Sequence, residues 1–282
     1  MKEVAKSMRQ RLLNLAKLKQ IDYNMLLIRY FHERFLYRLS LSPYRNSFYL
    51  KGGALLYALA KQYPRPTIDI DLLGIKIKND QINLLNIFTD ICRIEFPDDG
   101  VIFDYQSIKT SDINVRQKDH GIRISLVAYL DTIRQSLQID IGFGDESAMQ
   151  MISYPNLFDT LPSAEICAYS TEYIVAEKFH AMIILSELNS RYKDFYDIDM
   201  ILENRNFDNE RLTEAVKHTF HTRDTGYEEN HPLFSEAFVN DKNRLFHWKH
   251  FIHKINVPDL DFSHVVKNIT TRLHPIYNAL NE

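Results

Sequence analysis

The pattern of apolar and polar positions predicts helices at both ends of the chain and strands in its middle. Apolar residues recur at helical spacing over residues 1–20, and a second helix begins after Asp22, which can cap it. A third helix is expected over residues 53–63, where Pro64 and Pro66 end it, and a fourth over residues 80–96.

Strands are predicted where apolar and polar residues alternate between polar turns. These segments are residues 47–50, 67–77, 101–108, 122–130, 137–143 and 165–169. Beyond them the pattern is mostly helical, with helices expected over residues 172–188, 192–203, 208–221, 241–255 and 261–280. The predicted class is α+β: a mixed-sheet domain with N-terminal helices over residues 1–165 and a helical domain over residues 166–282. A cleft between the two domains is the expected place for a site.

Composition excludes several classes of protein. The chain has 282 residues, of which 45% are hydrophobic, and a formal net charge of −3. No apolar run approaches the roughly 20 residues that span a bilayer, and the charged N-terminus lacks a signal-peptide core, so a cytoplasmic protein is expected. Cys92 and Cys167 fit no metal or redox spacing and are expected to be reduced core residues. The acidic balance disfavours strong nonspecific nucleic-acid binding but permits a local basic patch.

Candidate chemistry begins with aspartates in two predicted strands. Alternation places Thr67, Asp69 and Asp71 on one face of their strand, with the two carboxylates about 6–7 Å apart. Asp140 holds the equivalent position in a later strand, and on neighbouring strands the three carboxylates would repel one another unless a cation neutralised them. Oxygen ligands suit Mg²⁺ or Mn²⁺. The alternative is the solvated face of an amphipathic strand, although aspartate is depleted in strands. The opposite face, expected to pack on the core, carries Ile68, Ile70 and Leu72.

A glycine pair between a predicted strand and a predicted helix is a candidate phosphate site. Gly52 and Gly53 would let backbone N–H groups approach an anion at the start of the helix, with Lys51 beside them. An ordinary glycine turn is the alternative, but the acidic strand that follows favours a nucleoside triphosphate site. The sequence contains no GxxxxGK[ST] motif, so it is not a P-loop protein.

The helical half offers counter-charges. Lys178 lies on the apolar face of its predicted helix, and Asp194 shares an inward-facing stripe, with Arg191 and Lys193 at the start of the same helix. Lys178 could bind phosphate, and Asp194 could orient Lys178 or the nucleotide. The alternatives are a lysine that reaches outward to solvent and an aspartate that caps the helix.

Five segments occur in one order between Leu50 and Ile198: "LKGGALLYAL", "TIDIDLL", "LQIDIGFGD", "AEKFHAM" and "NSRYKDFYDI". Together they resemble the AbiEii/AbiGii toxin family of nucleotidyltransferases, which includes the MenT-type toxins. The resemblance implies a polymerase-β-like nucleotidyltransferase core, a helical C-terminal region and magnesium-dependent transfer of a nucleotide from a nucleoside triphosphate. In MenT-type members the acceptor is the 3′ end of tRNA, and a cognate antitoxin is the expected partner.

By position, the resemblance implies roles for seven residues. They are Gly52 and Gly53 as the glycine motif, Asp69 and Asp71 as metal ligands with Asp140 as the third, and Lys178 and Asp194 as the lysine and acid of the helical half. One departure is Ala54, where many members carry a serine or threonine hydroxyl. Asp140 could act as metal ligand or as base toward the acceptor hydroxyl.

Other interpretations stay open. A small-molecule nucleotidyltransferase of the aminoglycoside-modifying kind would share the same motifs, and Ala54 fits an antitoxin-binding protein on a decayed fold. The segment over residues 114–123, with Arg116, Lys118, His120 and Arg123, is either a basic contact strip or a polar hairpin turn. A zinc site at His247, His250 and His253 lacks cysteine partners, so exposed helix histidines are the preferred interpretation.

Overall fold

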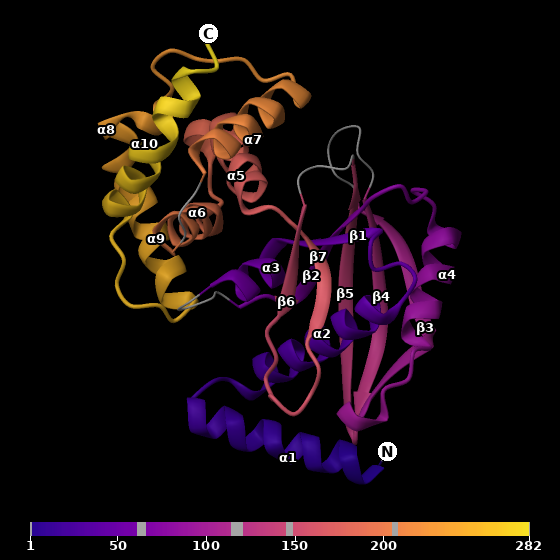
Figure 1. Cartoon of the computed structure of the whole chain (residues 1–282). Helices are drawn as coiled ribbons and strands as arrows, with labels where there is room; N and C mark the ends of the chain where they lie inside the picture. Colours follow the sequence, from indigo (N-terminus) through magenta and orange to yellow (C-terminus); the bar gives the residue numbers. More distant parts are fainter. Residues whose placement is uncertain (1, 61–65, 114–120, 145–148, 205–207, 282) are drawn as a thin grey trace. The chain divides into compact units, whose positions relative to one another are not determined.

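The structure, a computed structural model, describes residues 2–60, 66–113, 121–144, 149–204 and 208–281. The chain forms two compact units, a sheet unit and a helical unit (Figure 1). The sheet unit comprises Met1–Ala58 and Pro66–Tyr169, and the helical unit comprises Leu59–Arg65 and Ser170–Glu282.

The helices of the sheet unit follow the predicted order. They are α1 (Lys2–Lys19), α2 (Tyr23–Leu41), α3 (Gly52–Leu59) and α4 (Gln81–Cys92), with a short 3₁₀ turn at Pro97–Asp99. Asp22 caps α2 as predicted, because its side chain accepts a hydrogen bond from the Met25 backbone N–H at 2.9 Å. The predicted helix over residues 53–63 is wrong in its extent: α3 begins at Gly52 and ends at Leu59, and residues 61–65 lie outside the described residues.

A mixed seven-stranded sheet is the centre of this unit and confirms the predicted α+β class. The strand order is β3-β4-β5-β2-β1-β7-β6, in which the β2–β5 and β1–β7 pairs are parallel and the other neighbours are antiparallel. The strands are β1 (Phe48–Lys51), β2 (Asp69–Gly74), β3 (Val101–Ile113), β4 (Gly121–Leu130), β5 (Ile133–Phe143), β6 (Met149–Tyr154) and β7 (Ala164–Tyr169). The sequence did not predict β6, an edge strand on which Met149 and Met151 are about half exposed.

Alternation along the central strands separates a core face from a polar face. Ile70, Leu72, Ile139 and Ile141 are fully buried, while Asp69, Asp71 and Asp140 project from the opposite face and are half-buried. One expectation is wrong: Ile68 was placed on the core face, but its side chain is 64% exposed because β2 begins only at Asp69.

The helical unit confirms the predicted helices to within a few residues. It contains α5 (Thr171–Leu185), α6 (Tyr192–Asn204), α7 (Asn209–Thr222), α8 (Glu236–Val239), α9 (Lys242–Lys254) and α10 (Phe262–Asn278), with 3₁₀ turns at Ser186–Leu188 and Pro232–Phe234. Its core is aromatic: Phe179 contacts Phe220 and Tyr277, and Phe195 contacts Phe262. The short helix α8 was not predicted.

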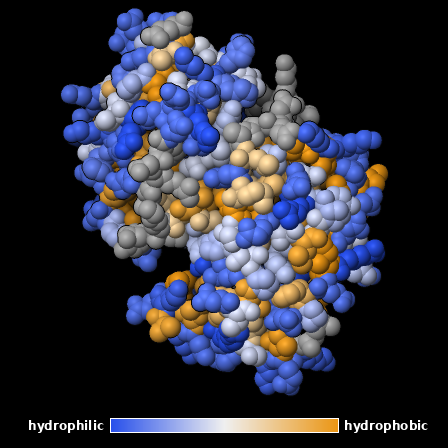
Figure 2. Space-filling model, in the orientation of Figure 1, coloured by the Kyte–Doolittle hydropathy of each residue, from blue (hydrophilic) through white to orange (hydrophobic). Residues whose placement is uncertain are grey.

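On the visible face of the molecule, apolar side chains form small separate groups within a mostly hydrophilic surface (Figure 2). Among the helices that the structure describes, none combines the length and apolar character needed to cross a membrane.

Candidate active site

A row of four charged residues crosses neighbouring strands of the sheet. In the strand register, Lys51 on β1 lies opposite Asp71 on β2, and Asp71 lies opposite Asp140 on β5. Asp140 in turn lies opposite Arg123 on β4. Residues directly opposite one another on adjacent strands project from the same face. The row therefore reads positive, negative, negative, positive across one face of the sheet.

The three aspartates converge as the strand pattern predicted. One carboxylate oxygen from each of Asp69, Asp71 and Asp140 lies within 4.8 Å of the others, the one such group found in the described part of the chain. Thr67 holds Asp69 in place, since its Oγ1 donates a hydrogen bond to Asp69 Oδ1 at 2.9 Å. Like charges at this separation repel, so the arrangement favours a bound cation.

Arg123 supplies positive charge that partly neutralises the three carboxylates. Its Nε and Nη2 donate to Asp140 Oδ1 and Oδ2, both at 2.7 Å, in a bidentate ion pair whose side chains are 39% and 18% exposed. The hydrogen bond and the negative charge of Asp140 raise the pKa of the Arg123 guanidinium. Asp140 is therefore engaged on both oxygens by a protein cation, a pairing that the sequence interpretation missed.

A turn signal could have revealed this pairing. Leu130 pairs with Ile133 across a two-residue turn at Asp131 and Thr132, and counting outward along both strands brings Arg123 opposite Asp140. The rest of the predicted basic strip, residues 114–120 with Arg116, Lys118 and His120, lies outside the described residues.

The glycine turn lies directly against the acidic group. Gly52 has a φ of 63°, in the left-handed region, and a Cβ at this position would come within 1.8 Å of Asp71 Oδ2. Only glycine fits, for reasons of both backbone conformation and space. Gly53 and Ala54 are buried in the first turn of α3, and because α3 begins at Gly52, its N-terminus lies beside Asp71.

Lys51 reaches across the sheet from the same turn. Its Nζ lies 3.3 Å from the position that a Cβ of Gly142 would occupy, so Gly142 leaves room for the ammonium group. Since Gly142 follows Asp140 by two residues on β5, the ammonium lies on the face that carries the acidic group.

The predicted residues of the helical unit form a second charged group. Lys178 Nζ lies 2.7 Å from Asp194 Oδ1 and 2.8 Å from Asp197 Oδ2, and Arg191 Nε lies 2.6 Å from Asp194 Oδ2. Both aspartates are buried, so Lys178 does not reach outward to solvent. Burial opposes the charge of Lys178, but Asp197 and Asp194 together outweigh it and raise the pKa of the ammonium group. Lys193 is exposed on α6.

Replacing Lys178 by methionine is expected to lower the free energy of unfolding by about 3–5 kcal/mol, because two buried aspartates lose their shared cation. Urea unfolding followed by circular dichroism gives the value. The matched variant Lys193→Met, an exposed lysine on α6, should change it by no more than about 0.5 kcal/mol. Equal, small effects of both variants would show that the Lys178 ion pairs do not stabilise the helical unit.

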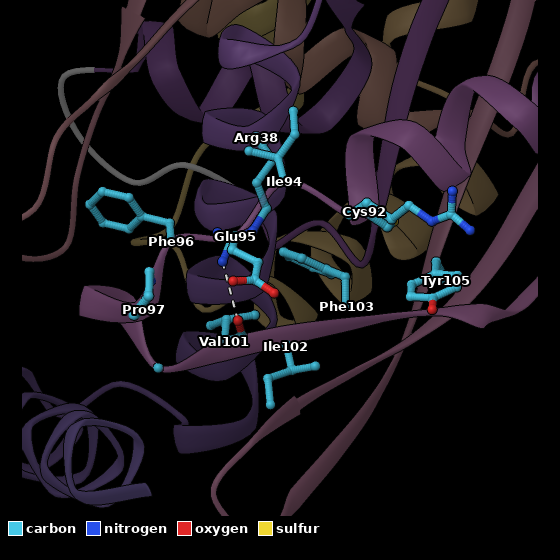
Figure 3. A pocket seen from close by; sticks show the side chains of 12 residues that line it. Arg38, Cys92, Ile94, Glu95, Phe96, Pro97, Val101, Ile102, Phe103 and Tyr105 are labelled. Carbon is cyan, nitrogen blue, oxygen red and sulfur yellow. Dashed lines mark hydrogen bonds between the residues drawn. The ribbon is translucent and has the colours of Figure 1, made fainter. Parts of the chain in front are cut away.

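A separate cavity of about 450 Å³ opens in the sheet unit near the end of α4, and none of the predicted site residues lines it. Figure 3 shows Arg38 on one side of this cavity, donating to the Val101 carbonyl at 3.1 Å. Arg38 is committed to a buried ion pair with Asp99, and Arg93 lies over the ring of Tyr105 at 4.7 Å from its centroid. Both arginines at this cavity are therefore engaged within the fold.

Comparison with known proteins gives the family. Residues 34–268 match the family described as "Nucleotidyl transferase AbiEii toxin, Type IV TA system". The chain belongs to the AbiEii nucleotidyl transferase toxin family. The match includes the aspartates of β2 and β5 and the Lys178 group, and it confirms the resemblance seen in the sequence. Comparison with curated proteins finds no match.

Two solved structures are similar in outline. One is JHP933 from Helicobacter pylori, at 15% identity and a TM-score of 0.48, covering 96% of this chain and 94% of that one. The other is a candidate nucleotidyltransferase from H. pylori, with the same identity and TM-score, covering 96% of both chains.

Membership of the AbiEii family establishes the general activity. The protein is a nucleotidyltransferase of a toxin–antitoxin system, with a nucleoside triphosphate as substrate and an antitoxin as partner. The zinc hypothesis for the α9 histidines gains no support, because the metal-ligand group found among the described residues is the acidic one.

Proposed function

We propose that this AbiEii protein transfers a nucleotide from a nucleoside triphosphate to the 3′ end of an RNA, with tRNA as the foremost candidate, and that it requires Mg²⁺ or Mn²⁺. The observation that supports metal dependence is the convergence of Asp69, Asp71 and Asp140 beside Gly52. The RNA acceptor rests on the family resemblance.

The acidic group fits a hard divalent ion, because it offers carboxylate oxygens from two neighbouring strands within 4.8 Å of one another. Asp69 and Asp71 would hold the ion, and Asp140 would join them as a third ligand. A bound ion would neutralise phosphate charge and lower the pKa of the attacking hydroxyl.

The protein's own groups would bind the triphosphate. Lys51 and the amides of Gly52 and Gly53 are the proposed phosphate contacts in the sheet unit, because they present positive charge and backbone donors on the acidic face. A nucleotide-binding role for Lys178, Arg191 and Lys193 of the helical unit is a separate proposal. Asp194 and Asp197 fix the position of the Lys178 ammonium, which makes it an oriented donor.

The proposed nucleotide transfer is a displacement at the α-phosphorus of the triphosphate. A hydroxyl oxygen of the acceptor bonds to this phosphorus, the bond to the bridging oxygen of the β-phosphate breaks, and pyrophosphate leaves. The hydroxyl proton would pass to Asp140 or to solvent. Arg123 occupies one lone pair on each Asp140 oxygen, so Asp140 would be a weaker base than a carboxylate without this ion pair.

Labelled nucleotide transfer tests the proposal. The purified enzyme is incubated with total RNA and each of the four α-labelled triphosphates, with Mg²⁺, with Mn²⁺ or with EDTA. Label should enter RNA of tRNA size, and EDTA should abolish its incorporation. A parallel reaction contains an aminoglycoside in place of RNA, and label that enters it but no RNA would establish the small-molecule alternative. If no acceptor is labelled and no triphosphate with Mg²⁺ raises Tm, the proposed transfer is wrong.

Replacing Arg123 by glutamine is expected to tighten Mn²⁺ binding about 10-fold in the absence of nucleotide, because the variant frees Asp140 from a competing cation. Calorimetric titration measures the affinity. Arg134→Gln, an exposed arginine on β5, makes the same charge change and should leave the affinity within about twofold. Weaker binding by Arg123→Gln would show instead that Arg123 positions Asp140 for the ion.

A further inference from the structure

Helix α9 is basic over its whole length. Its sequence, "KNRLFHWKHFIHK", contains no aspartate or glutamate in a chain whose net charge is −3. Only Arg244, Trp248 and Ile252 are buried along the helix. The exposed basic and titratable side chains are Lys242, His247, Lys249, His250, His253 and Lys254.

Arg244 fixes this helix to the rest of the helical unit. Its Nη1 and Nη2 donate to the carbonyls of Asn189 and Glu187 at 2.8 and 2.9 Å, and its guanidinium lies over the Phe238 ring at 3.8 Å from the centroid. The single buried cation of α9 is therefore used within the fold. The three lysines of the helix remain on the surface, so they can interact with a partner.

Aromatic rings accompany these charges. A shallow hollow of about 330 Å³ is lined by Ser190, Tyr192, His247, His250, Phe251 and Lys254. Within it, the rings of Tyr192 and His247 are stacked, with centroids 6.3 Å apart and an interplanar angle of 29°. Phe246, one residue away, is 71% exposed. A large exposed aromatic side chain beside lysines is typical of surfaces that stack unpaired bases and contact their phosphates.

A comparison with helix α1 shows which feature of the α9 surface is distinctive. Helix α1 also carries exposed lysines, at positions 2, 6, 17 and 19, but its sequence contains no aromatic residue. Such a helix can attract phosphate charge but cannot stack a base. The combination of lysines, stacked rings and a hollow therefore separates α9 from a surface that is only basic.

We propose that the α9 face, defined as Tyr192, Phe246, His247, Lys249, His250 and Lys254, binds a single-stranded segment of RNA. The lysines would contact phosphates, and Phe246 with the Tyr192–His247 pair would stack unpaired bases. The inference rests on the proposed function, in which RNA is the acceptor, and it assigns the contact surface for that acceptor. An acidic segment of a protein partner is the competing occupant.

Fluorescence anisotropy with the intact protein tests the assignment. The probe is a labelled single-stranded RNA of mixed sequence, titrated at several salt concentrations. Lys249→Gln/Lys254→Gln should weaken binding about 10-fold and reduce the salt slope by about 1.4, as expected for two lost phosphate contacts on a single strand. Phe246→Ala should weaken binding about 5-fold or more, with the salt slope unchanged.

The matched control is Lys6→Gln/Lys17→Gln on α1, which removes two exposed lysines without touching an aromatic residue. It should change the affinity by no more than about twofold. Equal losses from the α1 and α9 double variants, or no loss from Phe246→Ala, would overturn the assignment. Binding of an acidic peptide to α9, with no binding of the RNA probe there, would likewise overturn it.

Labelled transfer by the wild-type protein separates the two proposals. If the wild type labels RNA while the α9 variants bind RNA as the wild type does, only the α9 assignment fails. If the wild type labels no RNA yet binds the probe through α9, the proposed acceptor reaction fails and the binding surface stands. A wild type that neither labels nor binds RNA contradicts both.

Discussion

Replacing Asp71 by asparagine is expected to reduce nucleotide transfer by on the order of 1,000-fold, with the fold intact. Asp71 occupies the centre of the charged row, opposite both Lys51 and Asp140, and its Oδ2 lies against Gly52. Asparagine keeps the shape of the side chain and removes its charge. It also relieves repulsion within the acidic group, so Tm without metal should stay the same or rise.

The control for this variant is Asp112→Asn, which makes the same change at an exposed position on β3. Its transfer rate should match the wild type. Asp69→Asn should behave like Asp71→Asn, since both are proposed ligands of the same ion. Full activity of either variant would remove these aspartates from the mechanism, and a large fall in Tm would show that the loss reflects unfolding.

Replacing Gly52 by alanine is expected to reduce transfer by about 100-fold or more and to weaken metal binding. Alanine at a φ of 63° is strained, and its Cβ would come within 1.8 Å of Asp71 Oδ2. Either Asp71 rotates out of the acidic group or the β1–α3 turn shifts. Both movements separate the carboxylates from the glycine amides, so binding and catalysis should fall together.

Gly226→Ala is the matched control, because nothing lies within 4 Å of a Cβ added there and Gly226 has no positive φ. Its activity should equal that of the wild type. Metal titration and labelled transfer are measured on both variants. Wild-type metal affinity in Gly52→Ala would show that the close approach of Gly52 to Asp71 does not shape the acidic group.

The sequence predicted local structure well because alternation and helical spacing are local properties. Asp69 and Asp71 could be placed on one face of a strand from alternation alone. Their approach to Asp140 could not, since it depends on β2 and β5 being parallel neighbours. The Arg123 partner of Asp140 was accessible from the Asp131–Thr132 turn but was missed, because the arginine was assigned to a contact strip.

The contacts of buried polar residues also could not be predicted from the sequence. Helix α2 is buried around most of its circumference, and its inward residues include Glu33, Arg34 and Arg38. Burial raises the pKa of Glu33 to about 7, while its Oε2 accepts a hydrogen bond from the Leu157 N–H. The Arg38–Asp99 ion pair and the Glu33–Leu157 hydrogen bond join elements distant in sequence, so a periodicity analysis cannot predict them. Helical spacing placed Lys178 on an inward face, but its contact with Asp197 depends on how α5 packs against α6, which helical spacing does not predict.

Titration with Mn²⁺, followed by electron paramagnetic resonance, tests most directly whether the acidic group of β2 and β5 is the metal site. Wild-type protein and Asp112→Asn should bind the ion and release it to EDTA, and Asp71→Asn should show little bound signal at the same concentrations. Equal binding by Asp71→Asn and the wild type would place the ion elsewhere and contradict the account.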